Sequence, residues 1–277
     1  MPQYFVENSD PTIHFQVKEV LLNKQTDFQS LQVLETEALG RVMILDDCVM
    51  ITQKDEFVYH EMIAHLPVCF HNSPKTVVVI GGGDGGTVRE LVKHKEIEKI
   101  ILCEIDSGVI EAAKEFFPEV ACGLKDPRVE IRVGDGIAYM KTLENEVDIV
   151  LVDSTDPVGP GEGLFTKDFY RSVKKALKTD GIMAAQSESP WLEKEFLLKI
   201  KNNIAAGFEY IKPYVGSVPT YPFGLWSWTM ASNQKLETEK FNKDRFLKVA
   251  DDLQYLTVNC AKLAFEIPPF YRKKLEE

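Results

Sequence analysis

The chain has 277 residues, enough to bury a substantial core as one large domain or as a large domain beside a small one. Its 44% hydrophobic and 27% charged residues are ordinary values for a globular protein. The formal net charge of −11 argues against a nucleic acid partner, because phosphate binding needs a basic surface. An acidic surface is compatible with cationic ligands, which a negative field concentrates, but it is also compatible with a role in solubility alone.

The sequence contains no candidate for a membrane anchor. No run approaches the roughly 18 apolar residues that a transmembrane helix needs, and the polar residues among the first 17 argue against a signal peptide. Five cysteines, an odd number without a CxxC pair, indicate reduced thiols and neither a disulfide framework nor a metal site. We therefore expect a cytoplasmic protein with no bound metal and no membrane partner.

The N-terminal part has a short, β-like pattern. Apolar runs at 17–22, 30–35 and 41–45 are separated by turn-forming residues, which predicts a small antiparallel sheet. A helix with an apolar face fits residues 55–67. We expect an N-terminal β-sheet domain over 1–54 and a second domain over 55–277.

From residue 75 onward, strands and helices alternate. Apolar runs predict strands at 76–80, 100–103, 129–133, 147–152 and 182–185. Helical stretches lie between them at about 87–94, 107–117, 136–143 and 167–177. Short apolar strands alternating with helices indicate an α/β domain with a parallel sheet covered on both faces. The segments 208–214 and 226–231 predict a β-hairpin with a long connection.

A glycine-rich turn follows the first strand of this sheet. The run Gly81-Gly82-Gly83-Asp84-Gly85-Gly86 satisfies the G-x-G-x-x-G pattern between a strand and a helix. Glycine is needed there because the turn is tight and the backbone must approach a ligand closely. Glu104 ends the second strand, where an acidic side chain binds ribose hydroxyls. The two signals together predict nucleoside binding.

The charge of this turn indicates which nucleoside it binds. A carboxylate at Asp84 would repel the pyrophosphate that a dinucleotide places at such a loop, so a cationic sulfonium nucleoside fits better than NAD. A second acidic loop, Gly134-Asp135-Gly136, follows the third strand, where its carboxylate suits the amine of an adenine. The alternative for Asp135 is a helix N-cap.

Two more carboxylates follow the fourth strand. Asp153 ends it, and Asp156 lies in a Pro- and Gly-rich turn over 153–161 that could act as a lid. Asp156-Pro157 is also a common turn initiator. Five acids at one sheet edge (Asp84, Glu104, Asp135, Asp153 and Asp156) would repel one another unless the ligands were cations. The pattern therefore predicts a site for polycations.

Seven segments, in order and at family spacing over nearly the whole chain, resemble spermidine synthases. They are Asp55–Met62, Gly81–Gly86, Cys103–Asp106, Gly134–Gly136, Asp153–Pro160, Gln186–Glu188 and Pro219–Pro222. The resemblance implies a Rossmann-like, methyltransferase-type doubly wound sheet with a small N-terminal antiparallel β-domain. It also implies a homodimer or homotetramer assembled through the N-terminal part.

The resemblance further implies decarboxylated S-adenosylmethionine as a co-substrate and no tightly bound cofactor. The residues expected to hold this nucleoside are Gln32, Gly81, Gly83, Asp84, Glu104, Ile105, Asp135, Gly136 and Pro160. Asp153, Tyr59 and Tyr221 are the expected catalytic residues around the attacking amine. The expected amine-binding residues are His60, Asp84, Asp153, Asp156, Gln186, Tyr221 and Trp226.

The sequence also allows a more specific expectation for His60 and for the tryptophans of the last predicted strand. His60 stands where family members have His or Gln, so it need not be an acid–base group. Trp226 and Trp228 alternate along one strand, and we expect Trp226 to face the cleft and Trp228 the core.

The predicted function is transfer of the aminopropyl group of decarboxylated S-adenosylmethionine to putrescine, giving spermidine and 5′-methylthioadenosine. Asp153 would orient and deprotonate the amine during an in-line displacement. One alternative is an S-adenosylmethionine-dependent putrescine N-methyltransferase, and another is the same transfer to cadaverine, agmatine or spermidine. A catalytically silent polyamine-binding protein is a third, and an NAD oxidoreductase is disfavoured by Asp84.

Overall fold

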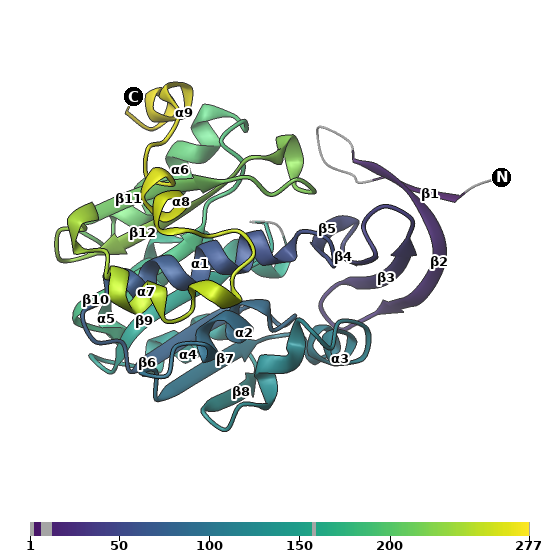
Figure 1. The fold of residues 1–277 in the computed structure, drawn as a ribbon, viewed down its shortest axis with the longest axis horizontal. Coiled ribbons are helices and arrows are strands. Elements are labelled where there is room, and N and C mark those ends of the chain that lie inside the picture. Colours follow the sequence, from purple (N-terminus) through teal and green to yellow (C-terminus); the bar gives the residue numbers. More distant parts are fainter. Residues whose placement is uncertain (1–2, 7–12, 157–158, 277) are drawn as a thin grey trace.

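The computed structural model describes residues 3–6, 13–156 and 159–276 (Figure 1). Its N-terminal part is a five-stranded antiparallel sheet in the order β1-β2-β3-β4-β5. The strands are β1 (Gln3–Val6), β2 (His14–Gln25), β3 (Ser30–Thr36), β4 (Arg41–Leu45) and β5 (Cys48–Thr52). The small antiparallel sheet predicted from the sequence is confirmed, but it begins earlier in the chain than expected.

A second sheet of seven strands follows, in the order β11-β12-β10-β9-β6-β7-β8. The strands are β6 (Thr76–Gly81), β7 (Lys99–Glu104), β8 (Val129–Val133), β9 (Val147–Asp153), β10 (Leu177–Gln186), β11 (Tyr210–Gly216) and β12 (Trp226–Ser232). Strands β8, β7, β6, β9 and β10 run parallel, and the hairpin β11–β12 joins antiparallel beside β10. The strand order turns back between β6 and β9, and ligands of such sheets bind at that switch point.

Helices cover both faces of this sheet in the described part of the chain (Figure 1). They are α1 (Glu56–Phe70), α2 (Gly86–Val92), α3 (Ser107–Phe116), α4 (Gly136–Thr142), α5 (Lys167–Ala176), α6 (Lys194–Ala205), α7 (Lys243–Leu247), α8 (Val258–Leu263) and α9 (Pro269–Glu276). Alternate residues of β6 enter different cores: Val77 and Val79 pack with α1 and α2, whereas Val78 and Ile80 pack with α4 and α5. This explains why the strands read as continuous apolar runs.

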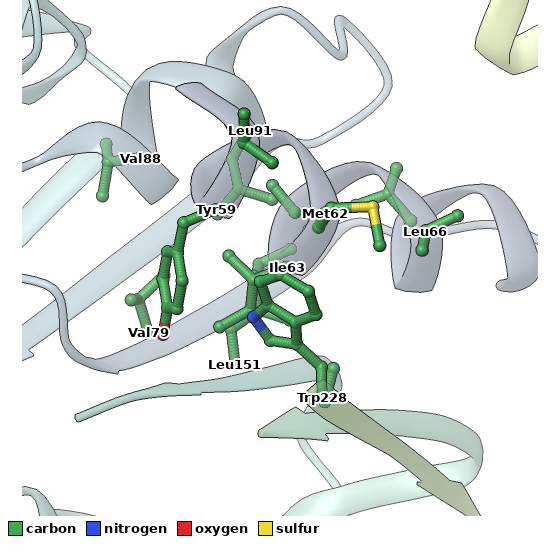
Figure 2. Close-up of a cluster of buried hydrophobic side chains, with 14 of the residues drawn as sticks. Tyr59, Met62, Ile63, Leu66, Val79, Val88, Leu91, Leu151 and Trp228 are labelled. Atoms are coloured by element: carbon green, nitrogen blue, oxygen red, sulfur yellow. The ribbon is translucent and has the colours of Figure 1, made fainter. Parts of the chain in front are cut away.

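Helix α1 is buried on almost every side, which differs from the single apolar face expected for residues 55–67. Every residue of α1 except Phe57 is buried. Figure 2 shows Ile63 and Met62 facing the indole of Trp228, with Val88 and Leu91 of α2 on the other side of the helix. Because α1 packs against both the large sheet and α2, it also buries polar side chains, and these need partners inside the protein.

The two sheets are linked by hydrogen bonds of buried carboxylates. Asp106, which caps α3, accepts from Thr26 Oγ1 at 2.7 Å and Gln29 Nε2 at 3.0 Å in the N-terminal sheet region. Asp55 accepts from Thr52 Oγ1 at 2.7 Å and from the backbone N–H of Thr220 at 2.9 Å. The first sheet ends at Thr52 and α1 begins at Glu56. The division into domains 1–54 and 55–277 stays a proposal.

Two further observations bear on the sequence predictions. None of the five cysteines, all of which lie in the described part of the chain, forms a disulfide. Within the described residues, no helix is both long enough and apolar enough to cross a membrane.

Candidate active site

A cavity of about 350 Å³ lies between the N-terminal sheet and the carboxyl edge of the large sheet. Met43, Leu45 and the stretch 48–51 form the wall on the N-terminal side. The predicted site residues that line the cavity are Tyr59, His60, Gly81, Gly83, Asp84, Glu104, Ile105, Asp135, Gly136, Asp153, Asp156, Gln186, Tyr221 and Trp226. The fold therefore brings together residues from seven separate segments of the chain.

Two predicted residues are not among the described residues that line the cavity, for different reasons. Gln32 lies in β3 opposite Asn23 and Ile44, and it is not among the described residues that line the cavity. Gln29, three residues earlier, lines it instead. Pro160 falls in a 3-10 turn over Gly159–Phe165, but its side chain lies outside what the structure describes.

The glycine-rich turn packs directly on the neighbouring strand. Gly81 has φ +78°, and a Cβ there would lie 2.1 Å from the carbonyl oxygen of Asp153. No other residue type fits this close approach at positive φ. The turn can therefore bring its backbone against the end of β9, where the cavity opens.

Glu104 stands at the end of β7 and is 7% exposed. Its carboxylate accepts from the backbone N–H of Asp106 at 2.9 Å and of Gly83 at 3.2 Å. Burial raises the pKa of Glu104 to about 7. The negative charges of Asp106 and Asp84 also raise this pKa, whereas the two backbone hydrogen bonds lower it. The carboxyl thus changes its charge near neutral pH.

This pKa predicts pH-dependent nucleoside binding. If Glu104 accepts from ribose hydroxyls, the affinity for 5′-methylthioadenosine should rise about threefold to tenfold between pH about 6 and about 8, because a carboxylate accepts more strongly than a carboxylic acid. Isothermal titration calorimetry across this range measures the change. Glu104→Gln should bind more weakly with a flat profile, and a flat wild-type profile would contradict the assignment.

The centre of the cavity holds an ion pair and a second carboxylate. His60 Nε2 lies 3.2 Å from Asp84 Oδ1, and His60, Asp84 and Asp153 offer polar atoms within 4.8 Å of one another. Burial opposes the charge on His60, but Asp84 and Glu56 outweigh it and raise the imidazole pKa to about 10. Burial acts against the charge on Asp84 too, yet His60 and the Gly86 N–H hold its pKa below the ordinary value. Asp84 and His60 are therefore charged at neutral pH.

The same three side chains could also hold a metal ion, judged by spacing alone. Both ring nitrogens of His60 face carboxylates, Glu56 at 2.5 Å and Asp84 at 3.2 Å, and a doubly protonated ring has no lone pair for a metal. An ion pair accounts for this cluster. The prediction of a reaction without metal stays a prediction.

Asp153 is the second carboxylate, at the end of β9 and 8% exposed. It accepts from Thr87 Oγ1 at 2.6 Å and from the Tyr59 hydroxyl. Burial and then the charge of Asp84 raise the pKa of Asp153, against the effects of His60, Thr87 and Tyr59. A carboxylate of raised pKa is a stronger base than an exposed one.

Aromatic rings enclose this centre. Tyr59 and Tyr221 have ring centroids 5.9 Å apart, and Tyr221 and Trp226 lie 4.6 Å apart edge to face. Tyr221 donates its hydroxyl to the carbonyl oxygen of Met50 at 2.7 Å, which ties it to the N-terminal sheet. Trp226 lines the cavity, whereas Trp228 lies in the core, as expected from their alternation. Aromatic faces suit the alkyl chain and the charge of an ammonium ligand.

Sequence comparison assigns the family. Residues 56–243 match the profile described as Spermine/spermidine synthase domain, and residues 3–53 match the one described as Spermidine synthase tetramerisation domain. The chain belongs to the spermidine synthase family. A protein of Thermoanaerobacter sp. (strain X514) named polyamine aminopropyltransferase is 43% identical over 100% of both chains. Another of that name from Moorella thermoacetica is 45% identical over 98% of this chain and 95% of its own.

Solved structures of spermidine synthases have the same fold. A crystal structure of one in complex with the transition-state analogue AdoDATO has a TM-score of 0.94 at 38% identity, covering 99% of this chain and 96% of that one. The enzyme from Thermotoga maritima gives 0.91 at 36% identity over 99% and 95%. The fold class predicted from the sequence, an α/β methyltransferase-like sheet with an N-terminal antiparallel domain, is confirmed.

One acidic residue of the cavity, Glu188, was not predicted from the sequence. Glu188 is 4% exposed, lines the cavity and accepts from Gln186 Nε2 at 3.0 Å. Burial and then Asp156 raise its pKa well above the ordinary value, and the two carboxyl groups share a hydrogen bond. The signal was present, because Glu188 follows Gln186 at the end of β10 on the same sheet edge. Its φ of +68° turns the chain there, which strand periodicity does not predict.

The lid predicted over 153–161 is only partly described. Ser154, Thr155, Asp156 and Gly161 line the cavity, and residues 157 and 158 lie outside the described part of the chain. Asp135 caps α4 by accepting from the Ile137 N–H at 2.7 Å, and it also lines the cavity. Its contact with an adenine amine stays a prediction.

Proposed function

We propose that this protein transfers the aminopropyl group of decarboxylated S-adenosylmethionine to putrescine, forming spermidine and 5′-methylthioadenosine. The observation that carries the proposal is the meeting of Asp84 and Asp153 in one aromatic-lined cavity at the end of the glycine-rich turn. A related spermidine synthase crystallised with the transition-state analogue AdoDATO at 38% identity supports it. Two carboxylates with atoms within 4.8 Å of one another suit substrates that bring positive charge on both an amine and a sulfonium.

The reaction needs the amine in its neutral form. A free alkyl amine has a pKa near that of lysine, about 10.4, and its protonated form cannot attack. In the proposed step the amine nitrogen bonds to the aminopropyl carbon next to sulfur, the carbon–sulfur bond breaks, and sulfur keeps the electron pair as methylthioadenosine. The proton that leaves the new ammonium passes to Asp153. Tyr59, which donates to Asp153, would orient that carboxylate.

We assign the two substrates to different residues of the cavity. Gly81, Gly83, Glu104, Ile105, Asp135 and Gly136 would take the nucleoside, and Asp84 the free amine of its aminopropyl chain. Asp156, Gln186 and Trp226, with the missed Glu188, would take the acceptor. The hydrogen-bonded pair of Asp156 and Glu188 is a suitable end point for the distal ammonium of a diamine, whose charge could replace the shared proton.

The test is a product analysis with two nucleosides. Purified protein should convert putrescine and decarboxylated S-adenosylmethionine into spermidine and 5′-methylthioadenosine, read by mass spectrometry. N-Methylputrescine and S-adenosylhomocysteine from intact S-adenosylmethionine would instead make the protein a methyltransferase. Parallel reactions with cadaverine, agmatine and spermidine define the acceptor range.

We also propose that the protein is a homo-oligomer assembled through its N-terminal sheet. The match of residues 3–53 to a tetramerisation domain supports a tetramer over a dimer. Light scattering after size-exclusion chromatography should give four times the 31.4 kDa chain mass, and a dimeric mass would reject the tetramer. A cytoplasmic location stays a prediction from the sequence.

A further inference from the structure

A buried row of charged groups runs from the cavity into the protein behind it. Asp84 Oδ1 lies 3.2 Å from His60 Nε2, and the other ring nitrogen, Nδ1, lies 2.5 Å from Glu56 Oε2. Glu56 in turn accepts from Arg89 through both carboxylate oxygens, at 2.7 and 2.9 Å. His60 is 1% exposed and Glu56 is 7% exposed. The imidazole is thus held between two carboxylates, one in the cavity and one outside it.

The row is anchored at its inner end. Arg89 also donates to Glu90 at 2.8 Å, and Glu90 faces His65 Nε2 at 2.8 Å and Lys93 Nζ at 2.5 Å. Because Glu90 is 1% exposed, this second cluster cannot shift without unpairing buried charge. Arg89 is therefore a fixed support for Glu56.

The position of the His60 ring is fixed by packing as well. A Cβ at Gly86 would lie 2.2 Å from the ring atoms, so the ring lies directly on the backbone of α2. The Tyr59 ring stands edge-on at 5.5 Å. This leaves the ring little freedom to turn, so its two nitrogens keep facing Glu56 and Asp84.

These contacts orient the cavity carboxylate. Asp84 Oδ1 accepts from the Gly86 N–H at 2.7 Å and faces His60 Nε2, and no described residue contacts Oδ2 closely enough for a hydrogen bond. Oδ2 is therefore the oxygen that is available to a ligand. If Nε2 lost its proton, its lone pair would face the Asp84 carboxylate, and the contact would become repulsive.

We propose that Glu56, supported by Arg89, is a positioning residue for the substrate site: it keeps His60 protonated and directed at Asp84, so that Asp84 presents one free oxygen to the cationic substrate. This inference rests on the proposed function. The charged and titratable groups that face His60 are Glu56 and Tyr59 from α1, Asp84 and Arg89 from the glycine-rich turn and α2, and Asp153 from β9. The raised imidazole pKa of about 10 agrees with the geometry.

The decisive variant is Glu56→Gln, which keeps the size of the side chain and removes its charge. A carboxylate partner shifts a neighbouring pKa by about 1–3 units, so the His60 pKa should fall from about 10 by at least about one unit. Nuclear magnetic resonance of ¹⁵N-labelled histidine measures this in the full-length protein without turnover. Steady-state kinetics should show KM for decarboxylated S-adenosylmethionine rising about tenfold above the new pKa, with kcat changed much less.

Glu61→Gln is the matched control. Glu61 lies on the same helix, is 1% exposed and accepts backbone N–H groups of residues 254–256 at 2.7–3.0 Å, away from the cavity. Its loss should lower the melting temperature but leave the His60 titration and the pH profile of KM unchanged. If Glu56→Gln fails to fold, Arg89→Lys is the second variant, because it keeps the positive charge but loses the bidentate contact with Glu56. It should shift the His60 pKa and the pH profile of KM in the same direction as Glu56→Gln, by a smaller amount.

Two results would overturn the inference. One is an unchanged His60 titration in Glu56→Gln, and the other is an equal change of the pH profile in Glu61→Gln. Failure of the proposed function is a separate outcome, because wild-type protein would then form no spermidine while the histidine titration could still be measured.

Discussion

Replacing Asp153 by asparagine is expected to lower kcat for spermidine formation by about 10²–10⁴-fold, the usual contribution of a general base. Asparagine can keep the hydrogen bonds that Asp153 accepts from Thr87 and Tyr59, but it cannot take a proton from the amine. The raised pKa of Asp153, caused by burial and by Asp84, makes the carboxylate a better acceptor for that proton. Kinetics at saturating substrate measure kcat, and calorimetry with 5′-methylthioadenosine should show nearly unchanged binding.

Asp148→Asn is a matched control on the same strand. Asp148 is 3% exposed, accepts from the backbone N–H groups of Lys75 and Thr76 at 2.9 and 2.8 Å, and pairs with Lys178 at 2.9 Å. This variant should melt at a lower temperature and retain kcat, since its partners lie away from the cavity. Near-normal turnover in Asp153→Asn would remove Asp153 from the role of base.

Replacing Asp84 by asparagine is expected to weaken the discrimination between decarboxylated and intact S-adenosylmethionine by about 10–100-fold. In the wild type the ionised Asp84 would pair with the free amine of the aminopropyl chain, and it would repel the carboxylate that the intact nucleoside carries nearby. A hydrogen bond to a charged group contributes about 1.5–3 kcal/mol, which corresponds to this range of ratios. Competitive binding of the two nucleosides measures the discrimination directly.

The control removes a charge elsewhere in the cavity. Asp135 lies after β8, two strands from the turn that holds Asp84, and faces the proposed adenine end. Asp135→Asn should weaken the binding of both nucleosides by a similar factor and leave their ratio unchanged. If Asp84→Asn discriminates as well as the wild type, the selectivity must come from other residues.

Strand periodicity was enough to predict where most of the acids meet. Asp84, Glu104, Asp135, Asp153 and Asp156 all follow strands that were recognisable as apolar runs, and all five line one cavity. The reason is geometric, since parallel strands present their carboxyl ends at one edge. The alternation of Trp226 and Trp228 was predictable for the same kind of reason, because successive residues of a strand face opposite sides.

Details that depend on how segments meet were not predictable. Gln29 and not Gln32 reaches the cavity, because the position of the N-terminal sheet is set by contacts such as those of Asp106. Glu188 enters it through a backbone turn at positive φ. The all-round burial of α1 also follows from its central place in the fold and not from its own pattern.

The sequence by itself determined the order of strands and helices, the acidic sheet edge and the family to which the chain belongs. Tertiary structure alone decided the pairing of Glu56 with His60 and Arg89, and hence the charge state of the imidazole beside Asp84. The physical reason is that periodicity depends on neighbours along the chain. A buried side chain instead acquires its charge from whichever groups the fold places within a few ångströms of it.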